Sequence, residues 1–251
     1  MGWVFFMSDF DFVSIDSSTG GNVLANTHLN RYFINSGFRK NSDLVGCVDR
    51  TLDGSIVFTT GSGRYDLMLV GGVHGDELSS QAALVCLMNE IIMGDINLKC
   101  KLHIMPFSIP ESTMLNSREF NSLDMNRNAH RCGVTGSIVD YAVDNNVTAL
   151  CDCHTTDPCK KPGFASVFCS VRPLIQSVRI AQRICSDTSS RILPVGDAGS
   201  VLRGAVEDES NIRGVPAVTC ESVSRCGFID GGSVDFSYSQ IISFLNYFGV
   251  I

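Results

Sequence analysis

The chain has 251 residues, a formal net charge of −7 at pH 7 and 11 cysteines. This length allows one large domain or two small ones, and we expect one. The acidity argues against a nucleic-acid or anionic-membrane surface, because no basic run exceeds Lys160-Lys161. The odd number of cysteines, several of them inside apolar runs, indicates buried reduced thiols rather than a disulfide framework.

Residues 1–50 form a weakly patterned N-terminal edge segment of the same domain. They are rich in Ser, Asn and Gly, which predicts turns and short strands. The apolar opening stretch lacks a basic segment and reaches Asp9 and Asp11 too early for a signal peptide. No window approaches the roughly 20 apolar residues of a membrane span. We therefore expect a cytoplasmic protein.

Residues 51–251 alternate between strand and helix patterns. Residues 66–72 are apolar at consecutive positions, as in a strand covered on both faces, and an amphipathic helix follows that ends near Gly94. Further strands are predicted at 55–60, 100–107, 147–153, 164–170 and 215–220, and further helices at 137–145, 173–186 and 236–248. This alternation predicts a single α/β domain with a mixed, mainly parallel central sheet and helices on both faces.

Polar residues gather where three of these strands end, the edge at which α/β proteins place their sites. His74 and Glu77 follow the first strand and are three residues apart, so one turn directs both the same way. With His154 they make a His₂Glu set, which binds zinc and leaves a fourth position for water. Glu221, at the third strand end, is the candidate general base. Taken singly, each histidine is better explained as a hydrogen-bonded structural residue.

The stretch around His154 also offers a competing, thiol-rich metal site. Cys151, Cys153 and His154 with Cys159 have the residue types of a structural zinc site. Alternation along the strand places Cys151 and Cys153 on one face and Asp152 and His154 on the other, which favours buried structural thiols. Asp152 is then a candidate to orient His154.

Residues 116–130 carry a group of cations between these loops. Arg118 and Arg127 suit a substrate carboxylate or a developing oxyanion, and Asn126 adds a neutral donor. The alternative is a solvated loop whose arginines pair with Glu119 and Asp124. On the residues alone, this alternative is favoured, because exposed arginine pairs are common and weak.

Taken together, these residues resemble the zinc carboxypeptidase (M14) superfamily over roughly residues 55–250. The resemblance rests on H-x-x-E from His74, on Arg118, on D-x-N-R-N at 124–128, and on the strand-end His154 and Glu221. Within the superfamily, residues 69–88 are most similar to the compact murein peptide amidase branch, which cleaves the γ-D-glutamyl bond to diaminopimelate. More distantly, the H-G-x-E, N-R and D-x-H-T segments resemble aspartoacylase and succinylglutamate desuccinylase.

The resemblance implies a zinc carboxypeptidase-like catalytic domain at 51–251 that binds one Zn²⁺ through His74, Glu77 and His154. In such an enzyme the following roles are implied: Arg118 polarises the scissile carbonyl, Asn126 and Arg127 grip a terminal carboxylate, and Glu221 is the general base. The resemblance thus reverses the solvated-loop interpretation of the arginines.

The implied activity is hydrolysis of a peptide or γ-glutamyl amide next to a free carboxylate, with murein-derived peptides as the expected substrates. The alternative is a deacylase of N-acyl amino acids, and a non-catalytic binding module is the least favoured hypothesis. In each case the partner is a small peptide or acyl-amino-acid ligand. The oligomeric state does not follow from the sequence.

Three features near the site depart from the pattern or need their own interpretation. Many superfamily members carry a tyrosine before the catalytic glutamate, and this chain has none between His154 and Glu221. The acidic run at 207–209 is expected to be a solvated turn, with a pocket wall facing a substrate amine as the alternative. Asp76 is expected to be a helix-start residue favoured by the helix dipole.

Overall fold

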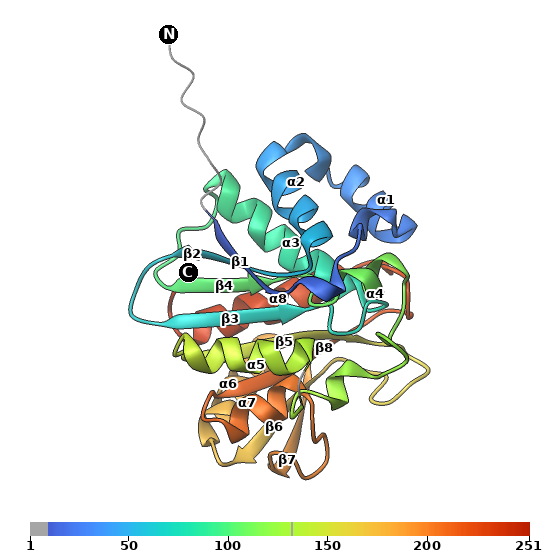
Figure 1. The fold of residues 1–251 in the computed structure, drawn as a ribbon. Coiled ribbons are helices and arrows are strands. Elements are labelled where there is room, and N and C mark those ends of the chain that lie inside the picture. The colour runs from blue at the N-terminus through green and yellow to red at the C-terminus, as the bar shows by residue number, and fades with distance from the viewer. Residues whose placement is uncertain (1–9, 132) are drawn as a thin grey trace.

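The computed structural model describes residues 10–131 and 133–251. The apolar stretch at 1–9, on which the prediction about a signal peptide largely rests, lies outside the described residues. Eight strands form one sheet in the order β1-β2-β4-β3-β5-β8-β6-β7 (Figure 1). The strands are β1 (Asp11–Asp16), β2 (Ser55–Gly61), β3 (Asp66–Gly71), β4 (Lys101–Met105), β5 (Ala149–Thr156), β6 (Ser166–Arg172), β7 (Arg191–Asp197) and β8 (Ala217–Val223).

The sheet is mixed with a mainly parallel centre, which confirms the predicted fold class. β3 pairs in parallel with β4 and β5, β5 pairs in parallel with β8, and β6 pairs in parallel with β7. The β1–β2, β2–β4 and β6–β8 pairs are antiparallel. β3 is buried from Leu67 to Gly71, because helices cover it on both faces, and this explains its uninterrupted apolar sequence.

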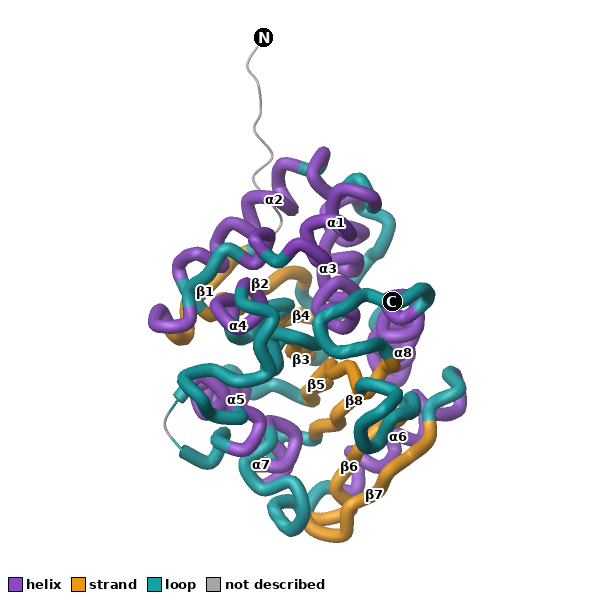
Figure 2. Tube along the Cα trace, turned by 90° about the vertical axis from the view of Figure 1, so that its right-hand side faces the viewer, coloured by secondary structure: helices purple, strands orange, loops and turns teal. Residues whose placement is uncertain are grey.

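Helices lie on both faces of this sheet (Figure 1, Figure 2). They are α1 (Thr27–Asn35), α2 (Ser42–Asp49), α3 (Leu78–Met93), α4 (Pro110–Met114), α5 (Val134–Asp144), α6 (Ile175–Asp187), α7 (Val206–Ile212) and α8 (Ser233–Tyr247). Side chains of α1, α2, α3, α6 and α8 form the core on one face, and side chains of α5 and α7 form the core on the other. Within the described ranges, no helix combines the length and the apolarity needed to span a membrane.

The N-terminal segment differs from its prediction of turns and short strands, because it contains α1 and α2 as well as β1. Each helix begins at an asparagine whose side-chain oxygen accepts backbone N–H groups: Asn26 from His28 and Leu29, and Asn41 from Asp43 and Leu44. Asparagine is typical both of turns and of helix N-caps, and here the second role applies. β7, α4 and α7 were also not predicted.

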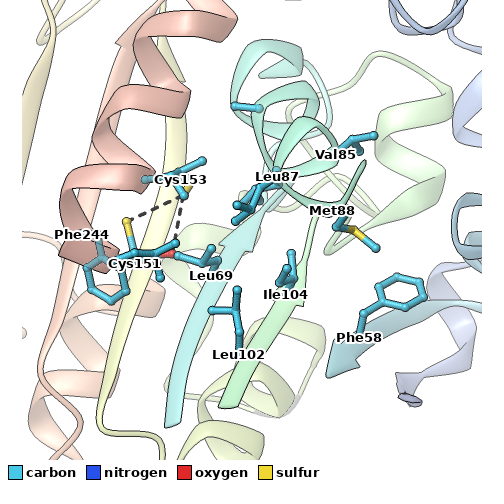
Figure 3. Close-up of a cluster of buried hydrophobic side chains, with 14 of the residues drawn as sticks. Phe58, Leu69, Val85, Leu87, Met88, Leu102, Ile104, Cys151, Cys153 and Phe244 are labelled. Atoms are coloured by element: carbon cyan, nitrogen blue, oxygen red, sulfur yellow. Dashed lines mark hydrogen bonds between the residues drawn. The ribbon is translucent and has the colours of Figure 1, made fainter. Parts of the chain in front are cut away.

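Cys151 and Cys153 are buried in the core on the α3 and α8 side of the sheet (Figure 3). Their sulfur atoms are 3.8 Å apart, and the sulfur of Cys151 lies 3.6 Å from that of Cys220. Cys159 is exposed, and the cysteines described in the structure are all free. The competing thiol-rich zinc site is therefore wrong, since the strand alternation separates these thiols from His154.

Candidate metal centre and active-site pocket

The loop between β3 and α3 carries the first two predicted metal ligands. Gly72 makes the turn out of the strand with φ +73°, and a Cβ there would lie 3.1 Å from the Cα of Phe107. Gly75 passes still closer to the chain, because a Cβ there would lie 2.0 Å from the carbonyl carbon of Ser112. The two glycines therefore let the His74–Glu77 loop lie directly against the segment that follows β4.

His74, Glu77 and His154 converge at one point, as predicted. The His74 Nδ1 lies 2.7 Å from Glu77 Oε1, and the His154 Nδ1 lies 2.7 Å from Glu77 Oε2. Each of the three residues offers one ligand atom within 4.8 Å of the other two, and all three side chains are buried. Two imidazoles and a carboxylate in this arrangement are the donor set that zinc prefers when one position stays open.

A carboxylate contacts the Nε2 atom of each imidazole, on the other side of the ring from the Nδ1 atom that faces Glu77. The Nε2 of His154 lies 2.9 Å from Asp152 Oδ2, and the Nε2 of His74 lies 2.9 Å from Asp124 Oδ1. When each Nε2 carries the proton that it donates to its carboxylate, the Nδ1 lone pair faces the common point. The contact of Asp152 confirms its predicted position, whereas the role of Asp124 was missed because the sequence offers it only as an arginine partner.

The electrostatics of this cluster favour a cation. Burial lowers the pKa of His154, but the charges of Asp152 and Glu77 outweigh it and raise that pKa well above its usual range. Burial likewise opposes ionisation of Glu77, yet the neighbouring imidazoles lower its pKa well below its usual range. The carboxylates therefore draw protons onto both Nδ1 atoms, and a divalent cation at the same point replaces that positive charge. The residues thus fit a zinc ion.

Glu221 lies beside this cluster because β5 and β8 are neighbours. In the parallel register, His154 is paired with Glu221, so both side chains leave the sheet on the same face. The Oε2 atom of Glu221 is buried and has no hydrogen-bond partner among the described residues. Burial, and then the charge of Glu77, raise the pKa of Glu221 to about 8. An unpaired carboxyl with this pKa exchanges protons near neutral pH.

Arg118 forms hydrogen bonds with the predicted metal ligand Glu77 and with Asp124, and it does not pair with Glu119. Its Nη1 donates to Glu77 Oε1 over 3.1 Å, and its Nη2 donates to Asp124 Oδ2 over 3.2 Å. The side chain remains 38% exposed, so one side of the guanidinium still faces the pocket. Of the two carboxylates named in the solvated-loop alternative, Arg118 pairs with Asp124, and it contacts the predicted metal ligand Glu77 as well.

Asn126 and Arg127 lie in the short 3₁₀ helix at Met125–Arg127, on the α5 and α7 side of the sheet. The Oδ1 of Asn126 accepts a hydrogen bond from Val206 N, and its Nδ2 lies 3.3 Å from His154 Nε2. Because that Nε2 donates to Asp152, the Asn126 amide keeps its N–H groups for another acceptor. Arg127 donates to its neighbour's backbone carbonyl and has no carboxylate partner within the described ranges.

All seven predicted site residues line one cavity of about 370 Å³. The structure adds residues that sequence reasoning did not assign to the site, chiefly Thr155, Thr156, Lys160, Lys161 and Phe168. Thr155 helps to fix the Glu77 carboxylate, because its backbone N–H donates to Glu77 Oε2 over 2.9 Å. The lysines were visible in the sequence as a basic pair, but only the fold shows which way their loop turns.

The acidic run was predicted incorrectly. Glu207, Asp208 and Glu209 belong to α7 and are all buried, so they form neither a solvated turn nor the lining of the pocket. Asp76 lies directly before Glu77, the N-cap residue of α3, and so is at the helix start as predicted. Burial and then the charge of Glu77 raise the pKa of Asp76, so its surroundings as a whole disfavour the charged form.

Comparison with known proteins identifies the fold only. No family model matches the sequence, and no curated protein matches it significantly. A succinylglutamate desuccinylase from a Silicibacter species is similar in structure, with a TM-score of 0.62 and 16% identity over 78% of this chain and 61% of that one. A succinylglutamate desuccinylase/aspartoacylase from Rhodobacter sphaeroides gives 0.58 and 16% over 78% and 60%.

Bovine thrombin-activatable fibrinolysis inhibitor, solved in complex with tick carboxypeptidase inhibitor, is similar as well. Its TM-score is 0.58 at 13% identity, over 77% of this chain and 85% of that one. The present chain spans about three fifths of the length of the two bacterial structures. At these identities the likeness establishes the shared α/β architecture.

Proposed function

We propose that the chain is a zinc-dependent hydrolase of the amide bond in a small substrate with a free carboxylate. The observation that carries this proposal is the convergence of His74, Glu77 and His154 in one pocket with the unpaired carboxyl of Glu221. The cation Arg127 lines the same pocket. This combination provides a metal position, a proton acceptor and a carboxylate partner within one cavity.

The Nδ1 atoms of the two histidines and the Glu77 carboxylate would hold the zinc ion. When bound, it supplies Lewis acidity towards a water molecule and towards the substrate carbonyl. The chain's own contribution is to fix the ligands: Asp124 and Asp152 hold the imidazoles, and Thr155 N with Arg118 holds Glu77.

Glu221 moves the proton in this proposal. As a carboxylate it accepts a proton from the attacking water, and as a carboxylic acid it returns the proton to the leaving amine. Burial beside Glu77 raises its pKa to about 8 and favours the acid form, and the positive charge of a zinc ion at the ligands would favour the carboxylate form. The exposed side of Arg118 stabilises the oxyanion that develops at the carbonyl.

Arg127 and the Asn126 amide are proposed to bind the free carboxylate of the substrate. A guanidinium is suited to paired hydrogen bonds with a carboxylate, and Arg127 forms no ion pair among the described residues. A fixed carboxylate places the neighbouring amide bond over the metal position, which is the usual gain from such a clamp.

N-acyl amino acids are the favoured substrate class. The names of the two bacterial structures of the same fold, a desuccinylase and a desuccinylase/aspartoacylase, support this choice. Peptides are the second candidate, supported by the structure solved in complex with a carboxypeptidase inhibitor. The narrower expectation of murein-derived peptides stays a prediction from the sequence resemblance.

Metal analysis and a substrate panel test the proposal. We expect one equivalent of zinc and hydrolysis of at least one N-acyl amino acid or peptide. Glu221→Gln should bind zinc but lose about 10²-fold or more in kcat. Glu119→Gln is the matched control, because its side chain is exposed. The absence of bound zinc, or equal turnover by wild type and Glu221→Gln, would refute the mechanism.

A further inference from the structure

Two free cysteines lie at one wall of the pocket and have no part in the proposed hydrolysis. Among the cysteines that the structure describes, Cys226 alone lines the pocket and Cys159 alone is exposed. Cys159 belongs to the segment that connects β5 to β6, and Cys226 belongs to the turn that follows β8. These two thiols are therefore the most accessible to a reagent that arrives from solvent or enters the pocket.

A single carboxylate holds the two cysteines next to each other. Asp157 accepts from the backbone N–H groups of Cys159 and Cys226 over 2.8 and 3.0 Å. These two bonds lower the pKa of Asp157, and a weaker bond from the Cys226 thiol acts in the same direction. The Cys226 sulfur thus lies beside the carboxylate that binds the Cys159 backbone. A disulfide joins cysteines whose Cα atoms are about 4–7 Å apart, a span similar to that of two amides on one carboxylate.

An ammonium group contacts the thiol in the pocket. Lys160 Nζ lies 3.2 Å from the sulfur of Cys226. Burial raises the pKa of Cys226, Lys160 acts against that rise, and the charges of Asp76 and Asp157 add to it. Because the thiolate is the reactive form of cysteine, the reactivity of Cys226 depends on this lysine.

We infer that Cys159 and Cys226 are a modification site, which a hydroperoxide converts into a disulfide while Lys160 stabilises the Cys226 thiolate. In the first step the Cys159 thiolate attacks the peroxide, so that an S–O bond forms, the O–O bond breaks and an alcohol leaves. In the second step the Cys226 thiolate attacks the Cys159 sulfur, so that the S–S bond forms, the S–O bond breaks and water leaves. The two thiol protons end on the alcohol and the water, and the two electrons lost by the sulfurs reduce the peroxide.

The disulfide would form a covalent link across the pocket wall. It would join residues 157–163, of which Lys160, Lys161 and Pro162 line the pocket, to the turn after β8. A thiolate at Cys226 neutralises Lys160 and a disulfide does not, so oxidation would also change the charge of this wall. The metal ligands and Glu221 take no part, and the inference does not depend on the proposed hydrolysis.

Limited oxidation followed by peptide mapping tests this inference. The reduced, zinc-loaded full chain is treated with tert-butyl hydroperoxide, the remaining thiols are blocked with N-ethylmaleimide, and the peptides are analysed without reduction. We expect a Cys159–Cys226 disulfide as the main product, which dithiothreitol reverses. In Cys226→Ser, dimedone should trap the sulfenic acid on Cys159. The control Cys185→Ser removes a partly buried thiol that does not line the pocket and should form the same disulfide.

The rate of disulfide formation tests the role of the lysine. Lys160→Gln should slow the reaction by at least about fivefold, whereas the matched control Lys161→Gln should keep the wild-type rate. Equal rates in the two lysine variants overturn the role of Lys160. Absence of this disulfide in wild type overturns the whole inference, whether Cys159 stays reduced, is oxidised to a sulfinic acid or links two chains.

Discussion

Glu207 provides a test of the structure that does not depend on the proposed activity. It is fully buried in α7, and its Oε1 accepts hydrogen bonds from Ser170 N, Ser170 Oγ and Asn211 Nδ2. Its Oε2 has no partner in the described part of the chain. Burial first, and the charge of neighbouring Asp208 second, raise the pKa of Glu207 to about 8 from an ordinary value of 4.5.

A raised pKa of this kind makes stability depend on pH. Between pH 4.5 and about 8 the folded protein keeps a proton on Glu207 that the unfolded chain has released. The free energy of unfolding therefore falls as the pH rises through this window and becomes level above it. At about 1.4 kcal/mol for each pH unit, the whole window corresponds to at most about 5 kcal/mol.

Glu207→Gln should remove this dependence. Glutamine keeps the acceptor for Ser170 and Asn211, offers an N–H group where the acid carries its proton, and does not titrate. Urea unfolding followed by circular dichroism from pH 5 to pH 9 should show the variant gaining several kcal/mol relative to wild type. Glu209→Gln, on the same helix, is the control and should follow the wild-type curve. Parallel curves for wild type and Glu207→Gln would refute the argument.

Three further substitutions test the site and its scaffold. Asp152→Asn should weaken zinc binding by about 10- to 100-fold, because His154 loses its orienting carboxylate. Competition for zinc with a chelating dye measures the Kd, and an unchanged Kd would contradict this prediction. Gly75→Ala should lower the free energy of unfolding by about 1–3 kcal/mol, because the added Cβ would collide with the Ser112 backbone. Thermal unfolding measures this change, and a Tm equal to that of wild type would contradict it. Gly46→Ala, in α2 with open space around it, should instead stabilise by about 1 kcal/mol, so a lower Tm is the contrary result.

The parts of the site that were predictable are those fixed by strands. Parallel strands bring their carboxyl ends to one edge, so His74, His154 and Glu221 could be grouped from their positions alone. The two faces of β5 were also predictable, because alternation decides which side chains enter the core.

The parts that were missed depend on contacts between residues far apart in the sequence. The run at 207–209 has the composition of a solvated turn, and only its packing against Ser170 of β6 shows that it is buried. Similarly, Asn26 and Asn41 have the composition of turns, but the helices that they cap are stabilised by apolar side chains packed against α3. Composition cannot reveal which way a loop such as 157–163 turns.

The pairing of His154 with Glu221 has a consequence for how this pocket can diversify. Both residues are on hydrogen-bonded neighbouring strands, so the ladder, with its spacing of about 4.8 Å between strands, sets the distance between metal position and proton acceptor. Residues 157–163, which connect β5 to β6, and the Arg127 segment lie outside that ladder. Insertions or substitutions there change which molecule is recognised and leave the bond-breaking geometry as it was, so recognition and chemistry can evolve independently.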